Sequence, residues 1–302
     1  VLGYLYDWLD KPTRRGARGD PLVLLLEKLS LRPFVKLLTE ERWDIIVNTH
    51  FLPAEIVASL RRKGTLDTPH FIVTTDFDTH RLWVNQPCER YFTATEEGAV
   101  YLSGWGVPRE DIGVTGIPVH PAFSRLKDRA TCLRNQGLGG DRPIVLQLAG
   151  GFGVGPVKLI LQAILSISEP VELAVVAGRN ERLKKQLEEI RPPQRHRLEV
   201  FGFTDRMDEL LAVADLVVSK PGGLTTSEVL ACGAAMAIVN PIPGQESRNS
   251  DYLLEQGAAI KINSLAVLPL KLSQLLGDRE RLSRLKAAST RLGRPRAAWY
   301  AS

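Results

Sequence analysis

The chain of 302 residues has little cysteine and no long apolar run, and each shortage excludes a class of protein. Its three cysteines, Cys88, Cys132 and Cys232, lie far apart and lack the spacing of metal ligands. They indicate buried or free thiols in a reducing compartment rather than a disulfide framework. Apolar runs such as Leu22 to Leu26 are far shorter than the roughly 20 residues that span a bilayer, so we expect a soluble or peripheral protein.

A secretory signal is also missing from the start of the chain. The first residues, VLGYLYDWLDKP, lack a basic start and a long apolar core, and no initiating Met is present. We therefore expect a cytoplasmic protein whose sequence begins at an internal position.

The net charge limits the possible binding partners but does not select one. The formal net charge of +5 and the pI near 9.2 are compatible with an anionic membrane surface, a nucleic acid or a phosphorylated ligand. The densest basic clusters, Arg14–Arg18 and Arg61–Lys63, are most simply interpreted as solvated surface.

Apolar runs of strand length alternate with helical patterns along most of the chain, which predicts an α/β fold. A hydrophobic content of 44% without low-complexity sequence is enough for two cores. The charged, glycine-containing segment 124–142 separates the two halves, and a new strand follows at Ile144. We therefore expect an N-terminal domain over residues 1–140 and a C-terminal domain over residues 141–302.

Two strand-to-helix turns in the second half carry the clearest functional pattern. The first, KPGGLTTSE at 220–228, combines a flexible Gly222-Gly223 turn with Thr225, Thr226 and Ser227 at a helix start, where the free N–H groups favour a phosphate. Glu228 follows within the first turn and can accept hydrogen bonds from sugar hydroxyls. One such turn is also what plain helix capping looks like.

The second turn, PIPGQESRN at 241–249, follows the next strand along the chain. On a helix that starts near Gln245, the side chains of Gln245, Glu246 and Asn249 share one face, which suggests a polyol ligand. Because carboxyl ends of parallel strands meet at one sheet edge, both turns are expected to border one ligand site.

Further notable residues follow predicted strands in each half of the chain. In TDFDTHRLW at 75–83, Asp76, Asp78 and His80 follow a strand, but Asp-x-Asp lacks a third metal ligand at recognisable spacing, so we expect no metal. His80 alone is more often a structural hydrogen-bonding group than a base. The glycine-rich VLQLAGGFGVGP at 145–156 fails as a dinucleotide fingerprint because Pro156 stands where a third glycine is needed.

The pair KPGGLTTSE and PIPGQESRN resembles the donor-binding half of glycosyltransferase family 28, and TDFDTHRLW, YFTATEE and VTGIPV are similar to its diacylglycerol-type members. These are the processive diacylglycerol glucosyltransferases and the monogalactosyldiacylglycerol synthases. The resemblance covers roughly residues 40 to 290 and implies a GT-B fold, with two Rossmann-like domains facing a cleft. The sequence departs from the family at Gly233-Ala234-Ala235, where Gly-x-Pro is usual.

The resemblance also implies the site. It places Asp76 and His80, as candidate bases, and Trp83 on the acceptor side, although Trp83 is also a candidate for the core or a membrane interface. No metal and no cofactor are implied, since the UDP-sugar is a substrate. For Phe203, a place in the core is an equally good alternative to the donor-binding role given to it below. The residues implied for the donor are Gly151, Gly153, Asn180, Gly202, Phe203, Gly222, Gly223, Thr225, Thr226, Glu228, Gln245, Glu246 and Asn249.

The implied reaction is inverting transfer of a hexose from a UDP-sugar to a lipid hydroxyl, most simply that of diacylglycerol, at an anionic membrane surface and without nucleic acid. Family members begin with a strand and a glycine-rich loop that bears a His, and neither is present in the sequence. This predicts an incomplete N-terminal domain with an exposed edge, and it leaves open a shortened homologue that binds UDP-sugar without catalysis. A UDP-sugar epimerase is a third, disfavoured possibility. The sugar and the oligomeric state stay open.

Overall fold

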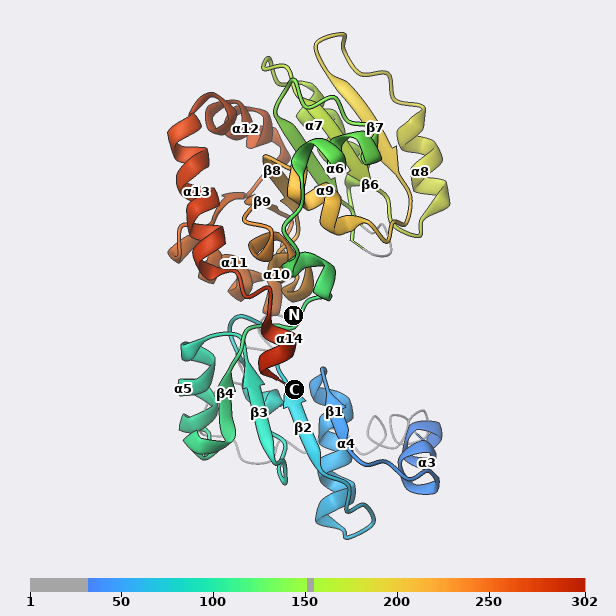
Figure 1. The fold of residues 1–302 in the computed structure, drawn as a ribbon, viewed down its shortest axis with the longest axis vertical. Helices are drawn as coiled ribbons and strands as arrows, with labels where there is room; N and C mark the ends of the chain where they lie inside the picture. Colours follow the sequence, from blue (N-terminus) through green and yellow to red (C-terminus); the bar gives the residue numbers. More distant parts are fainter. Residues whose placement is uncertain (1–31, 151–154, 302) are drawn as a thin grey trace. The chain divides into compact units, whose positions relative to one another are not determined.

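The computed structural model describes residues 32–150 and 155–301, which form two compact units (Figure 1). The first unit extends to Ile117 and the second begins at Pro118. Two of the expected donor residues, Gly151 and Gly153, lie outside the described residues.

The first unit is built on a parallel sheet of four described strands in the order β1-β2-β3-β4. Its strands are short and mostly apolar. The helices α4 and α5 connect consecutive strands, as parallel neighbours require. The elements are α3 (Arg32–Glu40), β1 (Ile46–Asn48), α4 (Phe51–Arg62), β2 (His70–Val73), η1 (Arg81–Trp83), β3 (Arg90–Thr93), α5 (Glu96–Gly104), η2 (Arg109–Asp111) and β4 (Ile112–Val114).

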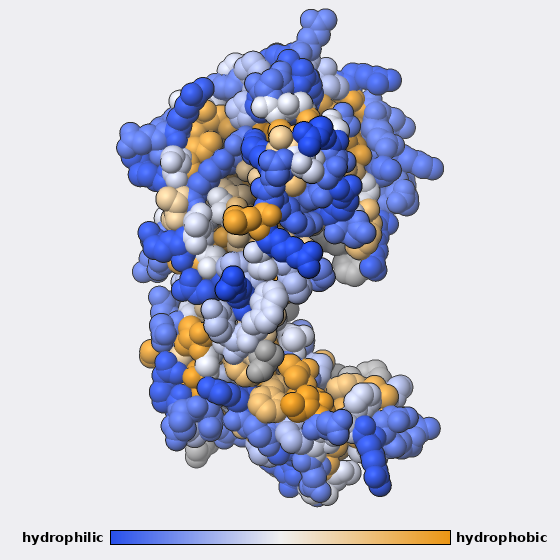
Figure 2. Space-filling view, viewed as in Figure 1, coloured by the Kyte–Doolittle hydropathy of each residue, from blue (hydrophilic) through white to orange (hydrophobic). Residues whose placement is uncertain are grey.

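Strand β1 forms the end of this sheet, and among the described strands it pairs only with β2. Two apolar side chains at this edge face solvent. Ile45, just before β1, is 53% exposed, and Val47, within β1, is 54% exposed. Figure 2 shows apolar surface gathered on part of this unit. The expected apolar edge is therefore present in the described residues.

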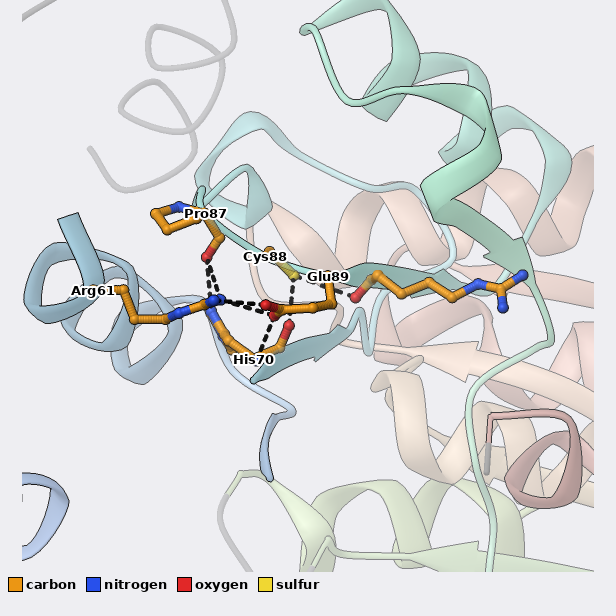
Figure 3. A network of polar contacts seen from close by, with 6 residues as sticks. Arg61, His70, Pro87, Cys88 and Glu89 are labelled. Carbon is orange, nitrogen blue, oxygen red and sulfur yellow. Dashed lines mark hydrogen bonds and ion pairs between the residues drawn. The ribbon is translucent and has the colours of Figure 1, made fainter. Parts of the chain in front are cut away.

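A polar network fastens the amino ends of β2 and β3, away from the strand ends where ligands usually bind (Figure 3). Arg61 donates two hydrogen bonds to the carboxylate of Glu89, at 2.8 and 2.6 Å, and Glu89 accepts a third from the backbone N–H of His70. Burial lowers the pKa of His70 to about 4 and raises that of the Cys88 thiol to about 12. Part of the basic cluster at 61–63 thus serves the fold rather than a partner.

The second unit contains a parallel sheet of six strands in the order β10-β9-β8-β5-β6-β7. The chain runs outward from β5 to β7, returns to β8 on the other side of β5, and then continues to β10. Its elements are η3 (Pro121–Ser124), α6 (Arg129–Gln136), β5 (Ile144–Leu148), α7 (Val157–Leu165), β6 (Glu172–Val176), α8 (Glu181–Glu188), β7 (Arg197–Phe201), α9 (Met207–Val213), β8 (Leu216–Ser219), α10 (Gly223–Ala231), β9 (Ala235–Val239), α11 (Gln245–Glu255), β10 (Ala259–Ile262), η4 (Leu265–Val267), α12 (Leu268–Gly277), α13 (Arg279–Leu292) and α14 (Ala297–Tyr300).

The inner strands of this sheet are buried on both faces, as continuous apolar sequence predicts. Every residue of β6, β8 and β9 is buried, and one large core cluster joins β5, β6, β8 and β9 to α7 and α12. No helix in the described ranges is long and apolar enough to cross a membrane.

The division between the units falls before α6 rather than after residue 140, where the charged segment suggested it. Helix α6 packs on α9, and the side-chain amide of Gln136 donates to Glu209 at 2.8 Å. Lys127, in the same segment, forms an ion pair with the partly buried Asp208 at 2.5 Å. These contacts tie residues 118–140 to the second unit, which charge patterning alone does not reveal.

Candidate functional site

The strand order of the second unit creates a site between β5 and β8. Successive connections leave these neighbouring strands in opposite directions, and such a switch point in a parallel sheet leaves a crevice at the carboxyl ends. A cavity of about 250 Å³ opens at this edge of the sheet. Its lining comes from the ends of β5 and β6, the segment after β7, the start of α9 and α10: Leu148, Ala149, Gly150, Val176, Gly178, Phe203, Thr204, Met207, Thr225 and Glu228.

The Pro-Gly-Gly turn leaves the N-terminus of α10 without a side-chain cap within the described part of the chain. Gly222 is the N-cap residue, and the hydroxyls that follow do not cap the helix as the sequence suggested. Ser227 donates back to the carbonyl of Gly223 at 2.8 Å, while Thr226 is fully buried. Thr225 alone of the three hydroxyl residues lines the cavity. The first N–H groups of α10 therefore remain suited to an anion.

Glu228 lines the same cavity, one helical turn after Thr225. Its carboxylate makes no hydrogen bond or ion pair with the described residues, and burial alone raises its pKa to about 7. A carboxylate in this condition gains a hydrogen-bond donor when a hydroxyl of a ligand enters the cavity.

The second turn lies against the first. The buried side-chain amide of Asn249 donates to the carbonyl of Pro221 at 3.1 Å, and Glu246 approaches to 3.9 Å from where a Cβ on Gly222 would lie. Glu246 also accepts a hydrogen bond from the N–H of Ile242 at 2.6 Å. The two turns thus form one surface, and the buried hydrogen bond from Asn249 to Pro221 joins them.

The start of α11 depends on glycine. Gly244 has φ 103° and ψ −121°, a conformation that a side chain would strain, and it directly precedes Gln245, the first residue of the helix. The helix that begins here carries Glu246 beside the Gly222 turn.

An aromatic residue closes the far side of the cavity. Phe203 is 62% exposed and lies against the Arg179 guanidinium, whose carbon is 4.8 Å from the ring centroid. The interpretation of Phe203 as plain core is therefore wrong. Gly202 precedes it after β7, and Asn180 caps α8 through a hydrogen bond from Leu183 N–H at 2.9 Å.

Lys220 is a residue that sequence reasoning passed over. It follows β8 directly and lines a smaller cavity beside Gly155 and Asn240. No carboxylate of the described residues lies within ion-pair distance of its ammonium group. Its place immediately before Pro-Gly-Gly was the available signal, because a lysine at the carboxyl edge of a parallel sheet lies where anions bind.

The expected acceptor-side residues lie together in the first unit, but below the surface. Trp83 donates from its indole N–H to Asp76 at 3.0 Å, and the imidazole of His80 lies 3.5 Å from the same carboxylate oxygen. Trp83 is 1% exposed, His80 2% and Asp76 6%, so Trp83 belongs to the core rather than to an interface. Phe51 packs edge-on against both rings. No group of three or more metal-ligating side chains occurs in the ranges that the structure describes.

Two parallel-sheet units, one with an uncapped helix N-terminus and a carboxylate at its switch point, define the GT-B class of nucleotide-sugar proteins. Two family models match: monogalactosyldiacylglycerol (MGDG) synthase over residues 5–119 and the glycosyltransferase family 28 C-terminal domain over residues 157–294. A processive diacylglycerol beta-glucosyltransferase from Bacillus mycoides is 35% identical over 265 residues, 87% of this chain and 68% of the relative. A relative with the same name from Bacillus licheniformis is 33% identical over 260 residues, which are 86% of this chain and 67% of the relative.

The chain belongs to glycosyltransferase family 28. It spans about two thirds of the length of these relatives. Among solved structures, MurG of Acinetobacter baumannii has a TM-score of 0.60 at 19% identity, covering 93% of this chain and 78% of that one. UDP-GlcNAc 2-epimerase of Neisseria meningitidis has a TM-score of 0.66 at 14% identity, and the match covers 96% of this chain and 81% of that one. These two similarities concern the fold alone.

Proposed function

We propose that the chain transfers a hexose from a UDP-sugar to a lipid hydroxyl, with inversion, and that diacylglycerol is the acceptor. The observation that carries this proposal is the cavity in which the uncapped start of α10 lies beside the carboxylate of Glu228. The family relatives, named as diacylglycerol glucosyltransferases, support the choice of acceptor.

The donor is arranged along the carboxyl edge of the six-stranded sheet in this proposal. The uracil lies against Phe203 and the backbone near Gly202, and the ribose hydroxyls donate to Glu228. The diphosphate accepts hydrogen bonds from the N–H groups at Gly222–Thr225 and pairs with the ammonium of Lys220, so that fixed dipoles and one cation stabilise the leaving group. Gln245 and Glu246 receive the sugar hydroxyls.

The acceptor side rests on Asp76 and His80. Their separation of 3.5 Å allows the carboxylate to orient the imidazole, which would then receive the proton of the lipid hydroxyl. Both side chains are almost fully buried, so the proposal requires the acceptor hydroxyl to reach a recessed imidazole. A peripheral position on an anionic membrane, favoured by the net charge of +5, is part of the same proposal.

The test is transfer of labelled hexose from UDP-glucose to diacylglycerol in mixed micelles, together with calorimetric titration of UDP. Glu228→Gln should lower UDP affinity about 10-fold or more, as loss of a charged hydrogen-bond acceptor does. Glu255→Gln, at an exposed position near the end of α11, is the matched control and should change neither measurement. Wild-type binding of UDP without transfer would favour the binding-only homologue, and absence of UDP binding would reject both.

A further inference from the structure

Gln147 is a polar residue in the middle of the apolar strand β5, and it is 1% exposed. Its side-chain nitrogen donates to the carbonyl of Val157, the first residue of α7, at 2.8 Å. Since that carbonyl can only accept, the amide orientation is fixed and the oxygen must point the other way. This Oε1 atom is buried and has no hydrogen-bond partner among the described residues.

A buried amide oxygen without a donor destabilises a fold, so its retention in a well-packed strand indicates a role beyond packing. The neighbours of Gln147 on its face of the sheet, Val145 and Ala149, belong to the apolar core. The hydrogen bond to Val157 gives the side-chain nitrogen a structural role and leaves the oxygen without one.

The sheet register directs Gln147 toward Lys220. Gln147 pairs with Val218 of β8, and Lys220 follows Val218 by two residues, which puts both side chains on the same face. Both line a small cavity of about 20 Å³, enough for one water molecule. The cavity therefore holds an acceptor that lacks a donor and adjoins an ammonium that lacks a carboxylate among the described residues.

We infer that Gln147 is a positioning residue for Lys220: a water molecule in this cavity accepts a hydrogen bond from the ammonium and donates one to Oε1 of Gln147. The bridge holds the cation at the switch point, beside Gly155, without neutralising it as a carboxylate would. The inference rests on the proposed function, in which this cation binds the diphosphate of the donor.

The test compares UDP with uridine, because only UDP carries the diphosphate that Lys220 contacts. The ratio of the two dissociation constants isolates the diphosphate from the nucleoside. We expect Lys220→Met to lower UDP affinity about 10-fold and Gln147→Met to lower it about 3- to 10-fold, with uridine affinity unchanged in both. The double variant should bind UDP no more weakly than Lys220→Met alone, because Gln147 acts through the lysine. Gln194→Met, at an exposed glutamine, is the control.

A second variant keeps the inference testable if Gln147→Met fails to fold. Gln147→Glu retains an acceptor but pairs with the ammonium, so UDP affinity should fall further as the pH rises and the carboxylate ionises, while uridine affinity stays constant. An unchanged ratio in the Gln147 variants, or equal loss of UDP and uridine, would overturn the positioning role. If wild-type protein binds neither ligand, the proposed function itself fails.

Discussion

In the proposed function, the carboxyl group of Glu228 makes nucleoside binding depend on pH near neutrality. Burial raises its pKa to about 7, so the side chain changes charge over a range where most carboxylates remain ionised. If only the ionised form accepts hydrogen bonds from the two ribose hydroxyls, the apparent dissociation constant grows in inverse proportion to the ionised fraction. Between pH 8 and pH 6 this predicts about tenfold weaker binding.

Uridine is the ligand for this experiment, because it carries the ribose but no phosphate that titrates in the same range. Its dissociation constant should be measured by NMR titration at half-unit steps between pH 6 and pH 8. Glu228→Gln should bind weakly at every pH and lose the dependence, whereas Glu255→Gln should retain it. A flat wild-type profile would refute the assignment of Glu228 to the ribose.

The same carboxyl group affects stability in the opposite direction. A carboxyl whose folded pKa is raised stabilises the fold fully below its unfolded value of 4.5, and this contribution is lost as the pH rises through about 7. The upper limit from the two pKa values is about 3.4 kcal/mol, and partial solvent access reduces it to about 1–2 kcal/mol. Glu228→Gln should therefore be more stable than wild type at pH 8 and nearly equal to it at pH 4.5 in chemical denaturation.

Three further predictions concern other named contacts. Burial lowers the pKa of His70 to about 4, so stability of the first unit is complete above pH 6.5 and falls by up to about 3 kcal/mol toward pH 4; denaturant unfolding of His70→Gln should show a flatter profile. Phe203→Ala should weaken uridine binding about 5- to 10-fold with almost no change in Tm, since the ring is 62% exposed, and a loss of Tm with intact binding would contradict its place in the site. Asn249→Leu leaves the Pro221 carbonyl without its donor and should cost about 1–3 kcal/mol in unfolding free energy; unchanged stability would show that the two turns hold together without this bond.

The sequence predicted most of the secondary structure because parallel strands buried on both faces are continuous apolar runs. β6, β8 and β9 are examples, and each ends at a glycine- or proline-containing turn or shortly before one. The boundary between the units was misplaced because α6 looks polar and joins the second unit through individual hydrogen bonds, such as that from Gln136 to Glu209.

Within the candidate site, sequence motifs identified the turns but not the depth of each side chain. Asn249 and Glu246 belong to one motif, yet Asn249 is 1% exposed and bonds to the backbone of the other turn. Trp83 and His80 likewise leave a strand end and are nonetheless buried. Gln147 was missed because it matches no pattern, and its relation to Lys220 appears only through the register of β5 on β8. Depth and register are properties of the assembled sheet, which a motif cannot encode.

Thr225 and Thr226 show how helix geometry separates adjacent members of one motif. Successive residues of a helix point about 100° apart, so Thr225 shares the cavity face with Glu228, three residues later, while Thr226 turns into the core and is 0% exposed. The Thr226 hydroxyl is buried without a partner among the described residues, so Thr226→Val should raise the unfolding free energy by about 1 kcal/mol and leave UDP affinity unchanged. Thr225→Val should do the reverse, with unchanged stability and UDP binding weakened about threefold to tenfold. Denaturant unfolding and calorimetric titration of both variants test the pair. If Thr226→Val lost UDP binding while Thr225→Val kept it, the face of α10 that meets the donor would be the one now assigned to the core.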